Sequence, residues 1–213
     1  MTKYNHFSSI DIDTIIGVSS VYKDSQLIAK HAGKLKFKSA LDMGTGTGFI
    51  AIYLSKLGFK CQGVDINPKA IDIAKKNAAK NNVKVSFYIS DLFDNVRGKF
   101  DLIIFNPPFG NMKSSFFSRY LEIIKSLFPR NNPIVSGITF QLIKKQRKKL
   151  IGSFLSGLGR FLTRNGKAII LLREQELGLV KDIPFRIIDR YWKYRIVLIG
   201  PLYPKNSRHA LHN

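Results

Sequence analysis

Cysteine and histidine are scarce in this sequence. A chain of 213 residues with one cysteine, Cys61, cannot form an internal disulfide, which fits a reducing compartment, and we expect a cytoplasmic protein. The four histidines are scattered with no cysteine pair near them, so no metal site is expected. No apolar run approaches the roughly 18–20 residues of a membrane helix, and the first residues contain no apolar signal-peptide core. We therefore expect one globular domain over residues 1–213 and no contact with a membrane.

Acidic residues are also few. The chain has 35 Lys and Arg against 14 Asp and Glu, a formal net charge of +21. Such an excess favours a polyanionic partner such as RNA, the ribosome or DNA. The alternative is that surface lysines only keep the protein soluble. The densest cluster, which we place at the start of a helix, is either a phosphate contact or a solvated helix face; it consists of Lys144, Lys145, Arg147, Lys148 and Lys149.

From Ser39 onwards, short apolar runs alternate with helical patterns, which predicts an α/β fold with a parallel sheet. The predicted strands are Ser39–Met43, Cys61–Asp65, Val85–Ile89, Phe100–Asn106, Lys167–Leu172, Phe185–Ile188 and Arg195–Ile199. The predicted helices are Gly48–Leu57, with Leu57 at a core position, Pro68 to Asn81, and Ile143–Leu162. A turn is expected at 164–166, before the fifth strand.

A glycine-rich loop joins the first strand to the next helix and contains Asp42, Gly44, Thr45, Gly46 and Gly48. Its spacing is G-x-G-x-G rather than the dinucleotide G-x-G-x-x-G, and the Lys-Ser/Thr ending of a phosphate-binding loop is missing. A carboxylate beside the loop suits a cation better than a pyrophosphate. S-adenosylmethionine offers an ammonium and a sulfonium and has no phosphate. The alternative role for Asp42 is to stabilise the turn.

Two further aspartates follow strands at the same predicted edge of the sheet. Asp65, after the second strand, can accept both hydroxyls of a ribose; alternatively it caps the helix that begins after Asn67. A ribose acceptor also fits NAD, so Asp65 indicates adenosine binding and no more. Asp91, after the third strand, is expected to accept the adenine amino group. Ile66 and Leu92, their neighbours, complete the predicted cofactor site.

The motif Asn106-Pro107-Pro108-Phe109 ends the fourth strand. A carboxamide or aryl amine nitrogen is a poor nucleophile because its lone pair is delocalised. The Asn106 side-chain oxygen and the Pro107 carbonyl can each hold one N–H of such a group, and this aims the lone pair at a methyl donor. The two prolines stiffen the loop, and Phe109 offers a face for stacking on a flat group. The motif predicts methyl transfer to a planar nitrogen, with these four residues as the catalytic group.

These residues resemble the class I methyltransferases that carry an (Asn/Asp)-Pro-Pro-(Tyr/Phe/Trp) motif, and among them the HemK/PrmC group, which methylates a glutamine of translation release factors. The resemblance implies a Rossmann-like fold: a seven-stranded, mostly parallel sheet with helices on both faces and a final antiparallel strand. It also implies S-adenosylmethionine as cofactor. The segment 21–27, which includes Tyr22, resembles one that closes over the cofactor in compact relatives. Residues 1–38 are accordingly expected to be a cofactor lid. Independently of the resemblance, segment 111–140 is irregular yet too apolar for a disordered linker, and its place after the fourth strand predicts a substrate flap.

The resemblance implies a release-factor glutamine as the methyl acceptor and leaves open the need for a small activator subunit. The charge, and Phe109 in place of the usual tyrosine, favour an alternative: adenine N6 or guanine N2 of RNA or DNA. A third hypothesis is a nucleic-acid-binding module on an inactive methyltransferase fold. The intact motif at 106–109 argues against an inactive site.

Overall fold

A computed structural model describes residues 7, 9–108 and 133–202. For residues 133–140 it describes the backbone only. Its helices are α1 (Lys23–Gly33), α2 (Phe49–Lys56), α3 (Pro68–Lys80), α5 (Pro133–Phe161) and the 3-10 helix η1 (Glu174–Val180). Its strands are β1 (Ser39–Met43), β2 (Lys60–Asp65), β3 (Ser86–Ile89), β4 (Phe100–Phe105), β5 (Leu162–Arg173), β6 (Phe185–Tyr191) and β7 (Tyr194–Ile199). In the described part of the chain, no helix is long and apolar enough to cross a membrane.

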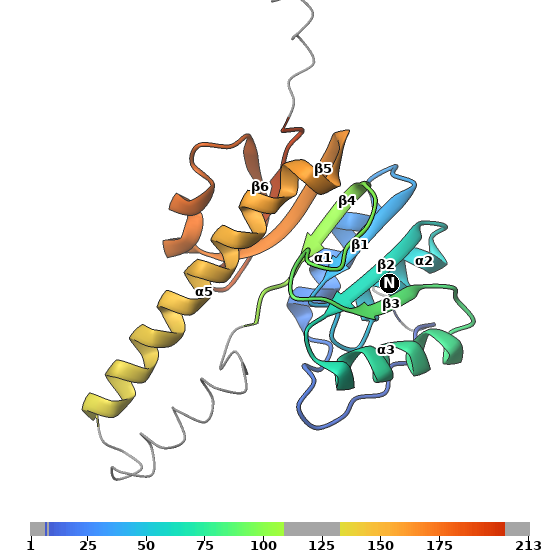
Figure 1. Cartoon of the computed structure of the whole chain (residues 1–213), viewed down its shortest axis with the longest axis horizontal. Coiled ribbons are helices and arrows are strands. Elements are labelled where there is room, and N and C mark those ends of the chain that lie inside the picture. Colours follow the sequence, from blue (N-terminus) through green and yellow to red (C-terminus); the bar gives the residue numbers. More distant parts are fainter. Residues whose placement is uncertain (1–6, 8, 109–132, 203–213) are drawn as a thin grey trace, which may run out of the picture.

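The seven strands form one sheet in the order β3-β2-β1-β4-β5-β7-β6 (Figure 1). The pairs from β3 to β5 are parallel, whereas β7 lies antiparallel to both β5 and β6. The predicted mostly parallel sheet and the antiparallel final strand are therefore confirmed. From β1 the chain adds β2 and β3 on one side of the sheet and then crosses back to add β4 on the other side of β1. In such sheets ligands bind at this switch point, beyond the carboxyl ends of the strands.

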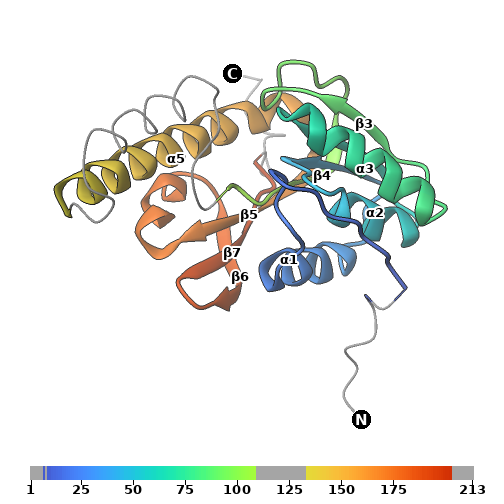
Figure 2. The ribbon, with the colours of Figure 1, turned by 90° about the horizontal axis from the view of Figure 1, so that it is seen from below.

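Apolar side chains cover both faces of the sheet, as the continuous apolar runs predict. Along β4, Leu102 and Ile104 face the core that α1, α2 and α3 cover, whereas Ile103 and Phe105 face the core that α5 covers. All four side chains are buried. Figure 2 shows α1 and α5 on opposite sides of the sheet. The helices on both faces are thus confirmed, and β4 is held rigidly in the centre.

Helix α3 matches its prediction closely. It begins at Pro68, and the Asn67 side chain caps it by accepting a hydrogen bond from the Lys69 amide at 3.1 Å. Its predicted apolar stripe is buried and comprises Ala70, Ile71, Ile73, Ala74 and Ala78. The stripe packs the helix against the sheet beside β2 and β3, which places Asp65 next to the helix start.

Other details of the prediction are wrong. Leu57 is 46% exposed because α2 ends at Lys56, so the residue does not reach the core. The turn expected at 164–166 is a bulge inside β5, where one residue of β4, Asp101, lies opposite four residues of β5. Gly166 is needed there because a Cβ would lie 3.0 Å from the Phe100 carbonyl oxygen.

Two helical segments differ from the sequence-based prediction. Helix α1 was not predicted, although Asp24, in its first turn, becomes part of the site described below. Helix α5 begins at Pro133, so 133–140 is helical rather than part of the irregular flap. The remainder of that flap up to residue 132, with Phe109, lies outside the described residues.

Candidate active site

Three neighbouring strands bring the predicted site residues to one edge of the sheet. Met43 of β1 pairs with Val64 of β2 and with Phe105 of β4. The next residue of each strand or loop, Gly44, Asp65 and Asn106, therefore lies at the same level as the other two. Adjacent strands are about 5 Å apart, so Asp65, the predicted ribose acceptor, and Asn106, of the predicted catalytic motif, each lie one strand spacing from the glycine loop.

The glycine loop adopts the backbone conformation that its glycines allow. Gly44, Gly46 and Gly48 have φ values of 65°, 55° and 83°, in the left-handed region that other residues avoid. At Gly48, a Cβ would also lie 3.0 Å from the Cβ of Ala74 on α3. Gly44 is exposed at the edge and has the space in which a ligand can approach the backbone.

Asp42 lies beneath this loop rather than on its surface. It is 3% exposed, and its carboxylate accepts a hydrogen bond from the Thr45 hydroxyl at 2.7 Å. Burial raises the pKa of this carboxyl to about 7, against the opposing effect of the Thr45 hydrogen bond. These contacts fit the turn-stabilising alternative. The role of Asp42 as partner of a ligand cation stays a prediction, and a carboxyl with this pKa would respond to such a cation.

Asp65 connects the glycine loop to the start of α3. One carboxylate oxygen accepts a hydrogen bond from the Gly46 amide at 3.0 Å, and the other accepts one from the Asn67 amide at 2.9 Å. Burial raises the pKa of this carboxyl, and the backbone hydrogen bonds oppose the shift. Each oxygen has lone-pair capacity left, so the two protein contacts leave room for the predicted ribose hydroxyls.

The other residues of the predicted cofactor site are exposed or half-buried at the same edge. Ile66 is 58% exposed, and Tyr22 is 58% exposed at the start of α1. Asp91 is exposed, and Leu92 is half-buried with φ of 43°. Ser90, which is buried, holds this turn by donating to the Leu92 carbonyl at 2.8 Å. Exposed apolar groups next to an aspartate suit the face and the amino group of a flat base.

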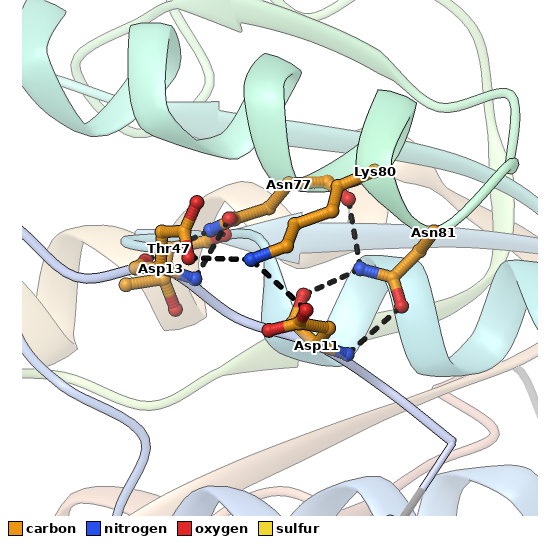
Figure 3. Close-up of polar contacts among 6 residues, drawn as sticks. All are labelled: Asp11, Asp13, Thr47, Asn77, Lys80 and Asn81. Atoms are coloured by element: carbon orange, nitrogen blue, oxygen red, sulfur yellow. Dashed lines mark hydrogen bonds and ion pairs between the residues drawn. The ribbon is translucent and has the colours of Figure 1, made fainter.

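The N-terminal segment is fixed to α3 by two asparagine side chains (Figure 3). Asn77 accepts from the Asp13 amide at 2.9 Å and donates to the Asp13 carbonyl at 3.1 Å and to the Thr47 carbonyl at 2.9 Å. Asn81 makes the same pair of bonds with Asp11, at 3.0 and 2.6 Å. Because it bonds both Asp13 and Thr47, Asn77 joins the N-terminal segment directly to the glycine loop, and its side chain is fully buried.

Asn106 is oriented by α1. Its Nδ2 donates to Asp24 Oδ2 at 2.8 Å and to Ser25 Oγ at 3.2 Å. Because a carboxylate only accepts, this contact assigns the nitrogen to the Asp24 side and the oxygen to the opposite side. Asn106 Oδ1 is buried and has no hydrogen-bond partner among the described residues. The site therefore presents one oriented acceptor that lacks a donor.

The two carbonyls that follow Asn106 are held by Arg147 of α5. Its Nη1 donates to the Pro107 oxygen at 2.7 Å and to the Pro108 oxygen at 2.6 Å. The prediction that Arg147 contacts phosphate at the surface is wrong, because the side chain is 1% exposed and paired with Glu176. Lys144 is half-buried, whereas Lys145, Lys148 and Lys149 are exposed. The cluster also lies inside α5, not at its start, since the helix begins at Pro133.

Sequence reasoning missed the supporting roles of Asp24, Ser25, Arg147 and Glu176 at the motif and of Asn77 at the glycine loop. One signal was present. Arg147 precedes Leu150, Ile151 and Phe154 by three, four and seven positions, which places it on the apolar stripe of its helix. A charged residue on such a stripe indicates a buried and paired side chain. No group of His, Cys, Asp or Glu able to hold a metal ion exists among the described residues.

Comparison with known proteins identifies relatives of this arrangement. The family model of the methyltransferase small domain matches residues 12–128. A Methanocaldococcus jannaschii protein, provisionally named a protein N5-glutamine methyltransferase, is 53% identical over 88 residues, 41% of this chain and 45% of that protein. The release factor glutamine methyltransferase of Buchnera aphidicola is 37% identical over 118 residues, 51% of this chain and 43% of that protein.

Relatives with other substrates also match. Ribosomal RNA small subunit methyltransferase C of Pseudoalteromonas translucida is 34% identical over 109 residues, 49% of this chain and 31% of that protein. This chain therefore spans less than half the length of these curated relatives. Among solved structures, a Pyrococcus furiosus methyltransferase superposes with a TM-score of 0.64 at 19% identity, covering 89% of this chain and 87% of that one. This likeness confirms the predicted Rossmann-like class I fold.

Proposed function

The chain belongs to the methyltransferase small domain family, and from that premise we propose that it is an S-adenosylmethionine-dependent N-methyltransferase whose acceptor is a glutamine side-chain amide, most naturally one in a translation release factor. Support for the acceptor comes from the relatives of Methanocaldococcus and Buchnera, whose names give glutamine as their substrate. Support for the chemistry comes from the geometry at Asn106.

The observation that carries the proposal is the buried oxygen of Asn106, for which the described part of the chain offers no hydrogen-bond donor. A buried acceptor without a donor costs about 1–3 kcal/mol, so a native site that keeps one needs a reason. A substrate N–H supplies the missing donor. Asp24 prevents the amide from turning its own nitrogen towards that donor, because the turned amide would place an oxygen against a carboxylate.

The residues around the glycine loop fit S-adenosylmethionine. Asp65 offers two carboxylate oxygens to a ribose, Ile66 offers an exposed apolar surface to the adenine, and Gly44 leaves the backbone open. No lysine of a phosphate-binding loop stands at this position, in keeping with a cofactor that lacks phosphate. When bound, the cofactor supplies a methyl group on a sulfonium, whose departure as a neutral thioether requires no proton donor.

The chain's own residues then prepare the nitrogen. Asn106 Oδ1 accepts one N–H of the acceptor amide and the Pro107 carbonyl accepts the other, which draws the nitrogen lone pair out of conjugation. Hydrogen bonds to the two oxygen acceptors stabilise the positive charge that develops on nitrogen, so no strong base is needed, and the methylated nitrogen then loses one proton to solvent water. Alignment is the main contribution, and favourable alignment is worth about 7–11 kcal/mol.

The test is transfer of labelled methyl from S-adenosylmethionine to purified release factor, ribosomal RNA and DNA in separate reactions. We expect label on the release factor, and peptide mass spectrometry should place it on a glutamine. Asn106→Ala should reduce turnover by ~10²–10³ and leave cofactor affinity nearly unchanged. Label that appears only on nucleic acid would reject the glutamine acceptor. Equal loss of cofactor binding in the variant would make Asn106 a structural residue.

One structural observation favours a second candidate, an exocyclic amine of RNA. The turn between β6 and β7 lies at the carboxyl edge, because Tyr194 pairs with Arg173 at the end of β5. At this turn Trp192 is 75% exposed, and Lys193 Nζ lies 4.8 Å from the centre of its ring. An exposed aromatic ring with cations beside it suits a stacked base and its phosphate.

The hairpin separates the two candidates experimentally. If RNA is the acceptor, Trp192→Ala should weaken binding of a single-stranded RNA oligonucleotide by ~1–3 kcal/mol, the usual contribution of one stacked base. Leu179→Ala, an exposed apolar change on η1, is the control. Unchanged RNA affinity in Trp192→Ala, together with methylation of the release factor, would eliminate this second candidate.

A further inference from the structure

Arg147 uses every N–H group of its guanidinium inside the protein. Nε donates to Glu176 Oε1 at 2.8 Å, and Nη2 donates to Glu176 Oε2 at 3.3 Å and to the Leu171 carbonyl at 3.1 Å. Nη1 donates to the Pro107 and Pro108 carbonyls at 2.7 and 2.6 Å. Arg147 and Glu176 are each 1% exposed. The guanidinium therefore connects α5, β5 and η1 to the catalytic motif.

Stability alone is a weak explanation for this pair. Removing two charges from water is costly, and well-packed apolar residues often replace a buried ion pair without loss of stability. Burial lowers the pKa of Arg147, and the hydrogen bond to Glu176 opposes that shift. A lysine would bring only three N–H donors on a flexible stem, whereas arginine brings five in a fixed plane. The planar arrangement is what two consecutive carbonyls, a carboxylate and a strand carbonyl require.

We propose that Arg147, neutralised by Glu176, is a positioning residue that fixes the Pro107 and Pro108 carbonyls and thereby aims the second acceptor at the methyl-receiving nitrogen. The role in transfer rests on the proposed function. A carbonyl oxygen has two lone pairs; Arg147 occupies one at Pro107 and leaves the other in a defined direction. Asn106 is oriented by Asp24 from the α1 side, so the two acceptors are set by buried charges on opposite faces of the sheet.

Glu176 has a separate task. Positive charge develops on the acceptor nitrogen during methyl transfer, and an uncompensated guanidinium behind Pro107 would oppose it. The Glu176 carboxylate lies on the far side of Arg147 from the motif and cancels that charge. It also accepts a hydrogen bond from the Arg173 amide at 2.8 Å, which fixes the start of η1. The pair thus supplies donors to the motif without a net charge beside the nitrogen.

The test compares three variants with the wild type. Arg147→Lys keeps the charge but cannot serve all five acceptors. The double variant Arg147→Met with Glu176→Gln removes both charges together, so that no buried charge is left unpaired, and glutamine can still accept from the Arg173 amide. Ser153→Ala, an exposed change on α5 outside the lysine cluster, is the control. Thermal unfolding is measured first, and the double variant should fold.

A carbonyl measurement tests the positioning independently of activity. Labelling proline carbonyl carbon with ¹³C and phenylalanine amide with ¹⁵N selects the two Pro-Phe pairs of the chain, Pro108-Phe109 and Pro184-Phe185. The Pro108 carbonyl resonance should move in Arg147→Lys and in the double variant, while that of Pro184 stays in place. If the Pro108 resonance stays in place in both variants, Arg147 does not fix the motif and the proposal is rejected.

Kinetics decide whether the positioning matters for transfer. With the acceptor that wild type methylates, kcat should fall ~10–10²-fold in Arg147→Lys and in the double variant, because a small misplacement of an acceptor has that effect. KM for the acceptor and cofactor affinity should change less than about twofold. A folded double variant with wild-type kcat would reduce the pair to a structural role. If wild type methylates no acceptor, the proposed function fails, and the carbonyl resonance still decides whether Arg147 holds the motif.

Discussion

The carboxylate of Asp24 and the amide of Asn106 face each other across 2.8 Å, although 82 positions separate them in the chain. Asp24 is 2% exposed in the first turn of α1, so its carboxylate has a fixed position. The contact determines which end of the Asn106 amide faces the acceptor side of the site. Within residues 7, 9–108 and 133–202 the Asn106 oxygen has no donor, and its orientation is a consequence of this pair and not of the motif alone.

Asp24→Asn should therefore lower kcat by ~10-fold or more, because an amide at position 24 can accept or donate and no longer forbids the turned Asn106. The fold should persist, since the replacement has the same shape. The measurement is kcat and acceptor KM alongside thermal unfolding. Ser25→Ala is the matched control: its contact with Asn106 is longer, at 3.2 Å, and does not dictate the orientation of the amide. Equal kcat values in Asp24→Asn and wild type would reject the orienting role.

Asp42 should make stability depend on pH. Burial raises its pKa from 3.8 to about 7, so between these values the folded protein keeps a proton that the unfolded chain has released. The contribution is complete below pH 4 and is lost as pH rises towards 7, up to about 4 kcal/mol in all. Asp42→Asn should remove this loss and be relatively more stable at pH 8 than at pH 4. Urea unfolding across this range measures it, with exposed Asp72→Asn as control.

The same carboxyl tests the predicted cation contact. If a cofactor cation favours ionised Asp42, affinity for S-adenosylmethionine should rise between pH 5.5 and 7.5 by roughly 20-fold, given a free-protein pKa of about 7. Calorimetry at each pH gives the affinity. Asp42→Asn should flatten this dependence. A wild-type affinity that is constant over the range would leave Asp42 with the turn-stabilising role alone.

Asn77 should matter more than its charged neighbour Lys80. Asn77→Ala leaves the buried Thr47 carbonyl without this partner, at roughly 1–3 kcal/mol, and also removes two hydrogen bonds to the backbone of Asp13, which is exposed. Cofactor affinity should fall as well, because Thr47 belongs to the glycine loop. Lys80→Ala removes only exposed ion pairs with Asp11 and Asp13. It should leave the free energy of unfolding, measured with urea, and the cofactor affinity, measured by calorimetry, nearly unchanged. The reverse order would mean that charge, not the asparagine, fixes the N-terminal segment.

The sheet was predictable because its evidence is local. Strands β1, β4, β5 and β7 each contain an apolar run, and the side chains of β4 are buried on both faces because they point alternately into the two cores. Asp65 ends β2, and the glycine loop and Asn106 directly follow β1 and β4, so the parallel sheet brings the three together by topology alone. Helix α1 was missed because it has only 11 residues and its buried apolar side chains, such as Ile28 and Ala32, are too few to form a clear helical stripe.

The supporting contacts were not predictable in the same way. The pairs of Asp24 with Asn106 and of Arg147 with Pro107 join segments tens of residues apart, and no spacing rule in one sequence specifies them. The prediction of an exposed Arg147 was wrong for a physical reason. The four lysines around it suggest a solvated helix face, whereas its position on the apolar stripe of α5 places its side chain in the interior. Charge composition predicts partners of a surface, and helical periodicity decides which charges belong to that surface.

The exposed lysines of α5 give the last prediction. With Arg147 excluded, Lys145, Lys148 and Lys149 remain as exposed cations that lie three and four positions apart on one face of the helix. If this face holds phosphates, binding of a structured RNA should weaken steeply with salt. Replacing the three lysines by glutamine should then reduce the slope of log affinity against log salt by roughly 2–3, since each phosphate contact contributes about 0.7–0.9.

A control is needed because any loss of positive charge weakens RNA binding. Lys75 and Lys76 are exposed on α3, which packs against the opposite face of the sheet from α5. Replacing them by glutamine should change the slope by less per lysine than the α5 variant does. Equal changes per lysine would mean that RNA senses only the net charge of +21, and no change in the α5 variant would make its lysines a solvated face. Either result would favour the glutamine acceptor, since no cationic surface would then be specific to the helix that also carries Arg147.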